Sequence, residues 1–201
     1  LFSCPWLLVN LFVKFSLPTS WLYALVALVL FPNAIATLRG ITRVYQGEHH
    51  TLKESLVNIW QTWRQQDRSR WGLHAVVVLI VMLFCGEFTL VMHQVALRFM
   101  IVPFLIVGAF LLAAVWHYLL IAAVDTEHKA PQQMLQAIYL SWRNLFLAVI
   151  LGLGVALWLS VGYQAPSLNV LAVNVIIFWI GYKLCYKSVG RVVTAVDEEV
   201  N

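Results

Sequence analysis

Long runs of leucine, valine and phenylalanine with almost no charge fill most of this chain, and they constrain its fold more than any other feature. Of the 201 residues, 62% are hydrophobic and only 11% are charged, whereas about a quarter of the residues in a soluble domain are charged. A globular core of this size needs a polar shell that this composition does not supply. We therefore expect an integral membrane protein whose apolar runs cross the bilayer as helices.

The apolar runs predict an all-α, polytopic membrane helix bundle that forms a single membrane domain over residues 1–201. Six transmembrane helices are expected over residues 1–17, 19–38, 71–92, 99–124, 144–163 and 168–187. Pro18 breaks the helix between the first two runs. The alternative is one long bent helix over residues 1–38, which leaves five spans.

Two further helices are expected to be amphipathic, over residues 51–65 and 131–143. Thr51 and Glu54 have the spacing of a capping box that opens the first of them. Its apolar side chains share one face: Leu52, Leu56, Ile59, Trp60 and Trp63. In the second, the apolar face holds Met134, Leu135, Ile138 and Trp142. We expect such helices to lie along the membrane surface, the alternative for the first being a helix packed under the bundle.

The basic residues predict the orientation of the chain. Of the 13 lysines and arginines, only Lys14 and Arg98 fall outside the segments at one side of the predicted bundle. The positive-inside rule then places residues 39–70, residues 125–143 and the C-terminus in the cytoplasm. Six spans imply a cytoplasmic N-terminus and five an external one. Because the sequence begins with Leu1 and not Met, the natural start can lie upstream.

The net charge of +4 and the pI of about 9.1 are explained by this orientation, so we expect the lipid bilayer and no nucleic acid as a partner. Cys4, Cys85 and Cys185 lie far apart in apolar runs, which predicts small buried side chains and no disulfide framework. The adjacent His49 and His50 cannot easily face one ion. We predict no metal site and no cofactor.

Ionisable side chains near the ends of spans are candidates for function, because burying charge in a bilayer is costly. Glu87, His93 and Arg98 form a predicted outer polar cluster, which can also be purely structural. Lys14 is expected to reach the interface, and His117 to be a hydrogen-bonded interior histidine. The chain has no H-E-x-x-H, G-x-S-x-G or Walker motif, so an enzyme is not expected.

Four small residues at i+4 spacing form a stripe that lets another helix approach closely: Ala148, Gly152, Ala156 and Ser160. The approaching helix belongs either to the bundle itself or to a partner subunit. The chain also contains two similar blocks, each with a span, a charged turn, an amphipathic helix ending in Trp-Arg (Trp63-Arg64 and Trp142-Arg143) and a new span. These blocks hint at an internal repeat of the kind found in transporters.

Several short motifs resemble the YesL-like family of bacterial integral membrane proteins. They are Asn10-Leu11-Phe12, the run from Pro32 to Leu38 with Arg43 and Gly47-Glu48 after it, the helix from Leu56 to Trp63, and Ala137 with Arg143-Asn144. Asn33 and Ile35 depart from the family pattern, which has small residues there. The resemblance implies a multi-helix protein associated with carbohydrate uptake systems, and it implies no catalytic residue.

These observations predict a non-catalytic accessory membrane protein that binds another membrane component, such as a sugar importer. The alternative is a small-solute transporter or channel built on the repeat.

Overall fold

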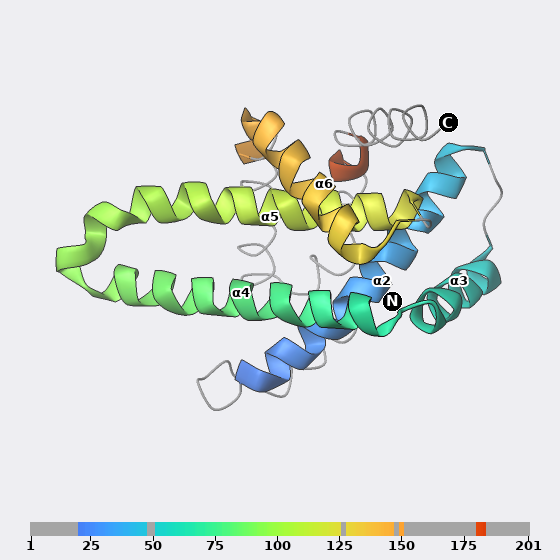
Figure 1. The fold of residues 1–201 in the computed structure, drawn as a ribbon, viewed down its shortest axis with the longest axis horizontal. Coiled ribbons are helices and arrows are strands. Elements are labelled where there is room, and N and C mark those ends of the chain that lie inside the picture. The colour runs from blue at the N-terminus through green and yellow to red at the C-terminus, as the bar shows by residue number, and fades with distance from the viewer. Residues whose placement is uncertain (1–19, 48–50, 126–127, 147–148, 151–179, 184–201) are drawn as a thin grey trace.

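The computed structural model describes residues 20–47, 51–125, 128–146, 149–150 and 180–183, and all the secondary structure in these residues is helical (Figure 1). The elements are α2 (Ser20–Tyr45), α3 (Leu52–Arg64), α4 (Arg68–His93), the 3-10 helix η2 (Val95–Met100), α5 (Ile101–Val124) and α6 (Ala130–Arg143). The predicted all-α class is confirmed for this part of the chain.

Three of the helices contain stretches long and apolar enough to cross a membrane: Ala24–Tyr45, Arg68–Phe88 and Ile101–Val124. They have 22, 21 and 24 residues, and a bilayer core needs about 20. Length and composition thus indicate a multi-pass membrane protein. The predicted span 1–17 and most of the predicted spans 144–163 and 168–187 lie outside the described residues.

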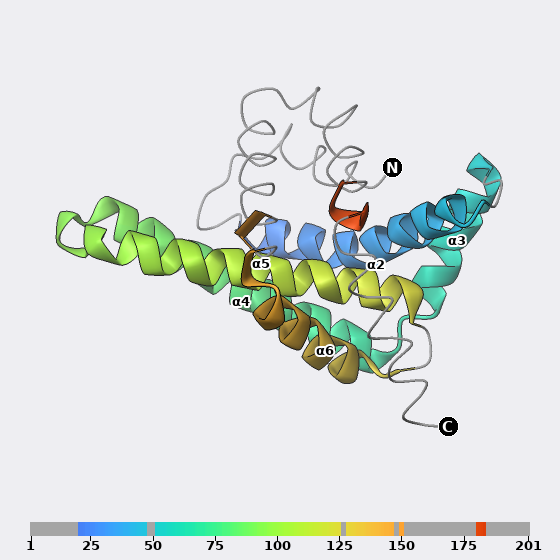
Figure 2. The ribbon, with the colours of Figure 1, turned by 90° about the horizontal axis from the view of Figure 1, so that it is seen from above.

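Helices α4 and α5 form a long antiparallel hairpin that η2 closes, and α2 lies across the half of the hairpin that is farther from η2 (Figures 1 and 2). Near the closed end, the rings of Phe84, Phe88 and Phe104 pack together with centroid distances of 5.5–6.5 Å. Gly108 of α5 lies directly against the ring of Phe84. A side chain at position 108 would fill the space that this ring occupies.

The core surrounds the second half of α5, from Ala113 to Ala123, where nearly every residue is buried. Helix α2 contributes apolar side chains that include Ile35 and Leu38, and α6 contributes Ala137 and Leu140. Tyr182, from the short helical segment 180–183, belongs to the same cluster. Helix α5 is therefore the central helix of the described bundle.

Several helix ends that carry basic residues gather at one end of the molecule, which we call the cationic end, whereas the end of α6 that carries Arg143 lies away from it (Figure 1). The cationic end is the right-hand end in Figure 1, where α2 finishes, α3 lies, α4 begins and α5 finishes. Its arginines are Arg39, Arg43, Arg64, Arg68 and Arg70. The hairpin tip at η2 lies at the opposite end (Figure 1).

The prediction that the second helix ends at residue 38 is wrong, because α2 continues to Tyr45. No residue in this stretch breaks the helix, and Thr42 is accommodated by donating its hydroxyl to the carbonyl of Leu38 at 2.9 Å. The helix is followed by Gly47, whose φ of 87° suits glycine at a helix C-terminus. Arg39 and Arg43 are consequently helical residues.

Both amphipathic helices form where they were expected. Thr51 accepts a hydrogen bond from the backbone of Glu54 at 3.3 Å, and the Glu54 carboxylate accepts one from the Thr51 backbone at 2.8 Å. The predicted capping box is confirmed.

Cys85 of α4 was expected to be buried, but it is exposed. Only 17% of the apolar stretch of α4 is buried, so most of its side chains are at least partly exposed.

We predict that Gly108→Ala destabilises the hairpin by about 1–3 kcal/mol, the usual cost of overpacking. A Cβ at this position would lie 2.8 Å from Cζ of Phe84, and the neighbouring rings restrict the movement of that side chain. The thermal midpoint of the purified protein in mild detergent measures the effect.

Gly86→Ala is the matched control, because nothing lies within 4 Å of a Cβ built at Gly86. Its midpoint should equal or exceed that of the original protein, since alanine favours helix more than glycine. Equal midpoints for the two variants would contradict the close approach at Gly108.

Candidate functional site

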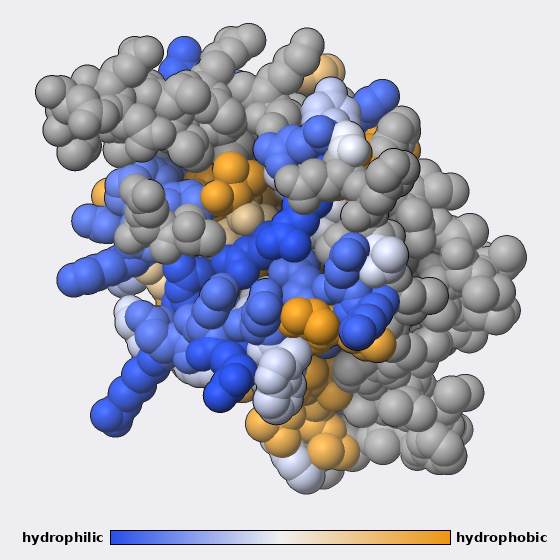
Figure 3. Space-filling model, turned by 90° about the vertical axis from the view of Figure 1, so that its right-hand side faces the viewer, coloured by the Kyte–Doolittle hydropathy of each residue, from blue (hydrophilic) through white to orange (hydrophobic). Residues whose placement is uncertain are grey.

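Polar side chains are buried between the helices in the half of the bundle next to the cationic end. The buried polar residues are Thr42, Asn58, Thr62, His74, His117, Asp125, Gln133 and Ser141. Hydrophilic residues also cover much of the surface at this end (Figure 3). Burying polar groups is unfavourable unless they are hydrogen-bonded. We treat these residues and Arg39 as the candidate functional site and call them the polar layer.

Arg39 joins three segments of the polar layer. Its guanidinium donates to Oγ1 of Thr62 at 3.3 Å and to Oε1 of Gln65 at 3.0 Å. It also donates to the carbonyl oxygen of Ala122 in α5 at 3.3 Å. All three acceptors are neutral, and Nε is buried without a hydrogen-bond partner among the described residues. Arg39 therefore orders α2, α3 and α5, and no acidic side chain among the described residues pairs with its charge.

Two more hydrogen bonds attach α3 to α2. Nδ2 of Asn58 donates to the carbonyl oxygen of Ala36 at 3.0 Å, and Nε1 of Trp63 donates to Oδ1 of Asn33 at 3.0 Å. Both donors lie on α3, and both acceptors belong to the preceding long helix. The position of α3 is thus fixed by polar contacts.

Helix α3 exposes large apolar side chains together with the charged residues Lys53, Glu54 and Arg64. Leu56 is 52% exposed and Trp60 is 65% exposed, whereas Asn58 and Thr62 are only 4% and 1% exposed. Apolar residues do share a face, as expected, but the bundle packs mainly against the polar face. In lipid, turning an apolar face towards the protein brings no hydrophobic gain in free energy. The polar face of α3 therefore makes the contact with the other helices.

His74 of α4 and Tyr118 of α5 form a buried pair. Nε2 of His74 lies 2.9 Å from the Tyr118 hydroxyl, and both side chains have zero exposure. Phe31 of α2 stacks on the imidazole with ring centroids 4.6 Å apart, and Trp71 meets it edge-on. Nδ1 of His74 is buried with no described partner. This histidine was not among the residues singled out from the sequence.

His117 connects α5 to α6. Its Nδ1 lies 2.9 Å from the carbonyl oxygen of Ala113 and 2.9 Å from Oγ of Ser141. Because a carbonyl can only accept, Nδ1 carries the proton. The expectation of a hydrogen-bonded interior histidine is confirmed at Nδ1, while Nε2 is buried without a described partner.

The turn between α5 and α6 is closed by Asp125. Its Oδ2 lies 2.9 Å from Nδ1 of His128, and its backbone carbonyl accepts from Nε2 of Gln133 at 2.8 Å. Gln133 is fully buried. These contacts fix the angle at which α6 leaves the end of α5.

The two amphipathic helices, α3 and α6, make equivalent hydrogen bonds through a hydroxyl side chain. The sequence LVNIWQTWR (56–64) aligns with LQAIYLSWR (135–143), and Thr62 and Ser141 occupy equivalent places. Each hydroxyl donates at 2.8 Å to the carbonyl four residues earlier. Each also contacts a nitrogen of the preceding long helix, Arg39 for Thr62 and His117 for Ser141. This correspondence favours the predicted internal repeat, with α2–α3 equivalent to α5–α6.

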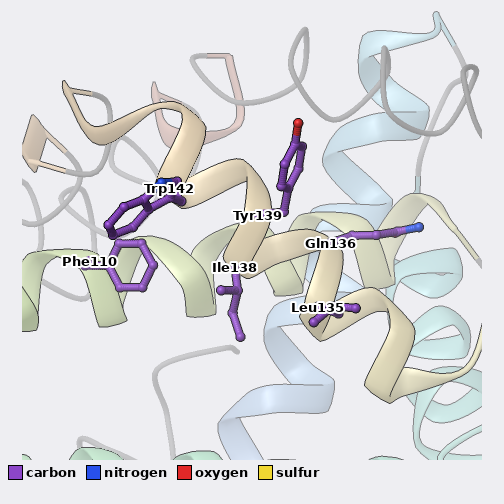
Figure 4. A pocket seen from close by; sticks show the side chains of 6 residues that line it. All are labelled: Phe110, Leu135, Gln136, Ile138, Tyr139 and Trp142. Atoms are coloured by element: carbon purple, nitrogen blue, oxygen red, sulfur yellow. The ribbon is translucent and has the colours of Figure 1, made fainter.

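A shallow apolar groove of about 550 Å³ lies on the outward side of α6. It is lined by Phe110, Leu135, Gln136, Ile138, Tyr139 and Trp142 (Figure 4). The rings of Phe110 and Trp142 meet edge to face, 6.1 Å apart. The inner side of α6 carries buried Gln133, Ala137 and Ser141, so this helix also turns apolar side chains outward.

The polar layer offers hydrogen-bonding groups and the positive charge of Arg39, and the groove on α6 offers apolar surface. Among the described residues, no three His, Cys, Asp or Glu side chains lie close enough to hold a metal ion together. His49 and His50 lie outside the described residues. The imidazoles of His74 and His117 have different partners, because His74 contacts Tyr118 of α5 and His117 contacts Ser141 of α6.

The residues predicted to form the outer polar cluster lie around the hairpin tip, away from the polar layer. Glu87 and His93 of α4 are exposed, and Arg98 lies in η2, where the structure does not describe its side chain. No contact between Glu87 and His93 occurs among the described side chains. The predicted stripe of Ala148, Gly152, Ala156 and Ser160 lies outside the described residues, as does Lys14.

Most residues of the polar layer were not identified from the sequence, because only ionisable side chains within the predicted spans or near their ends were candidates for function. Arg39 lies just beyond the predicted span 19–38, and Asn58 lies off the apolar face of a helix expected at the membrane surface. The signal that could have found them is the repeated hydroxyl-Trp-Arg sequence at residues 62–64 and 141–143.

The chain matches no known protein family, no curated protein sequence and no solved structure. The similarity of residues 31–38 to the YesL-like family therefore stays a prediction. The function of the chain has to be inferred from the contacts of its own side chains.

We predict that Tyr118→Phe destabilises the protein by about 1 kcal/mol, because it removes the hydrogen-bond partner of a buried histidine. Tyr139→Phe is the control, since the Tyr139 side chain is 60% exposed on α6. Thermal midpoints in detergent give the comparison. The double variant His74→Phe with Tyr118→Phe should recover most of the loss, and a Tyr118→Phe variant as stable as the control would contradict the pair.

We also predict that Trp63→Phe loosens α3 from the bundle, because it removes the donor to Asn33. Trypsin cleavage after the exposed Lys53 should become several-fold faster, since a lost hydrogen bond of about 1 kcal/mol changes an opening equilibrium by that factor. In Trp60→Phe, which alters an exposed indole, cleavage should keep its original rate. Equal rates in the two variants would show that this bond does not hold α3.

Proposed function

We propose that this chain is a non-catalytic membrane protein that binds another membrane protein through the outward face of α6. The observation that carries the proposal is the apolar groove beside that helix. Trp142 is 69% exposed and Leu135 is 71% exposed there, and the groove between α6 and Phe110 is large enough to receive side chains of a partner helix.

The composition of the groove favours a protein partner over lipid alone. Its lining is almost wholly apolar and includes the rings of Tyr139 and Trp142. Tryptophan and tyrosine are enriched among residues that dominate protein interfaces.

We also propose how the protein lies in the membrane. The basic residues of the cationic end support placing that end in the cytoplasm of a bacterium, because basic segments are retained on that side. The groove on α6 would then face the bilayer near the cytoplasmic surface. The C-terminus, which lies outside the described residues, is proposed to be cytoplasmic too.

The resemblance to the YesL-like family suggests the class of partner. That family is associated with carbohydrate uptake, so the proposed partner is a membrane subunit of a sugar importer. The small-residue stripe from Ala148 to Ser160 is a second proposed contact of this kind. Neither proposal requires a cofactor or a catalytic residue.

We predict that a photo-crosslinking amino acid at Tyr139 captures a membrane protein in intact cells. The same amino acid at Leu79 is the matched control, because Leu79 of α4 is 59% exposed and far from the groove in sequence. Denaturing gels and mass spectrometry identify the products.

An adduct of one defined mass at Tyr139, absent at Leu79, supports the docking face. Lipid adducts alone at both positions would refute it. A protein adduct that is not a sugar-importer subunit would keep the docking face and reject the proposed partner class.

The repeated contacts favour a second candidate, a small-solute transporter or channel. Transporters are often built from repeats, and here the repeats share the contacts of Thr62 with Arg39 and of Ser141 with His117. Reconstituted liposomes containing the protein should then show solute flux above that of empty liposomes. Flux that is unaffected by Glu87→Gln and His93→Ala would exclude the hairpin tip from the pathway, and absence of flux for a broad solute set would reject this candidate.

A further inference from the structure

Three arginines at the cationic end, which we call the arginine cluster, lie close together: Arg39, Arg43 and Arg70. Arg43 follows Arg39 by one turn of α2, so both lie on the same side of that helix. Arg70 is in the first turn of α4, one turn before His74, which contacts Tyr118 of α5. Because α4 and α5 are antiparallel, Arg70 lies at the level of Ala122, whose carbonyl oxygen accepts from Arg39. Two helices thus bring three positive charges together.

Nothing among the described side chains neutralises this charge. Arg39 donates only to neutral oxygens, and three N–H···O contacts leave part of its five-donor guanidinium unused. The side chains of Arg43 and Arg70 make no hydrogen bond or ion pair with described residues. Asp67, the nearest acid in sequence to Arg70, caps α4 by accepting from the Arg70 backbone at 2.8 Å.

The position of Arg70 shows that part of the cluster lies against the bundle. Arg70 precedes His74 by one helical turn, so it lies on the same side of α4 as that fully buried histidine. Arg70 is itself half-buried, and Arg43 is exposed. The cluster therefore has an inner, ordered member in Arg39 and two outer members whose guanidinium groups have no described partner.

We propose that the arginine cluster binds a phosphate-bearing anion at the cationic end of the bundle. Guanidinium groups match phosphate oxygens in geometry and charge. The hydrogen bonds to Thr62, Gln65 and Ala122 hold Arg39 in place, and Arg43 and Arg70 close on the anion from α2 and α4. Binding removes the mutual repulsion of the three charges.

Two sources could supply this anion, a free phosphate compound or the headgroup of an anionic phospholipid. The neighbouring surface suits the second, because Leu56 and Trp60 of α3 are exposed beside the polar layer. Helices with an apolar face and basic neighbours bind the interface of anionic membranes. The two sources share the phosphate chemistry and are separated by the experiment.

The experiment follows the thermal midpoint of the purified full chain in non-ionic detergent. Three probes are titrated at constant ionic strength: inorganic phosphate, dihexanoyl-phosphatidylglycerol and dihexanoyl-phosphatidylcholine. We expect phosphatidylglycerol to raise the midpoint in a saturable way and phosphatidylcholine to have little effect. A comparable rise with inorganic phosphate identifies a free anion as sufficient, and no rise with it identifies a lipid headgroup.

The double variant Arg43→Gln with Arg70→Gln is the central test. It leaves the described hydrogen bonds of Arg39 intact, so the unliganded protein should keep its midpoint or gain stability from reduced repulsion. Its apparent affinity for the anion should fall by at least about tenfold, the effect of losing one charge-assisted hydrogen bond. Arg68→Gln is the matched control, because Arg68 is an exposed arginine of the same helix end, and it should bind as the original protein does.

Several outcomes overturn the proposal. One is no saturable rise with either phosphate or phosphatidylglycerol. Another is an equal rise with phosphatidylcholine, which would indicate a general lipid effect. A third is equal affinity in the double variant and in Arg68→Gln, which would place any anion site outside the arginine cluster.

Discussion

Hydrogen bonding between helices strongly influences how this bundle is assembled, because in lipid the packing of apolar side chains has no hydrophobic driving force to add to it. Helix α3 is held by Asn58 and Trp63 and by the guanidinium of Arg39. Helix α6 is held by Ser141 on His117, together with the Gln133 contact at the turn. Both helices consequently present their apolar sides outward. The same constraint creates the groove beside Phe110 and leaves Trp60 exposed.

The sequence is sufficient to predict the elements that depend on local signals. The Thr51–Glu54 capping box, the proline at the start of α6 and the apolar runs of α4 and α5 all have local causes. The C-terminal end of α2 was mispredicted because the charged residue Arg39 was taken as the end of the helix. Arg39 in fact donates hydrogen bonds to neutral oxygen atoms on two other segments. Such acceptors are far away in sequence, so no local pattern reveals them.

The polar layer was harder to predict than the helices for a related reason. His74 is one histidine in an apolar run, and only the approach of Tyr118 from the other arm of the hairpin shows that it has a fixed partner. Helical periodicity found the apolar face of α3 correctly. Which face meets the protein depends on the surrounding solvent, since water would favour burying Trp60 whereas lipid does not.

The helical segment 180–183 has a consequence for the order in which the fold is completed during synthesis. Tyr182 belongs to the central cluster, its ring lies 5.8 Å from that of Tyr45, and Gly181 touches the indole of Trp116 so closely that no methyl group fits between them. Residues 180–183 are synthesised after α2 and α5, so Trp116 cannot reach the packing described here until Gly181 and Tyr182 have been added to the chain.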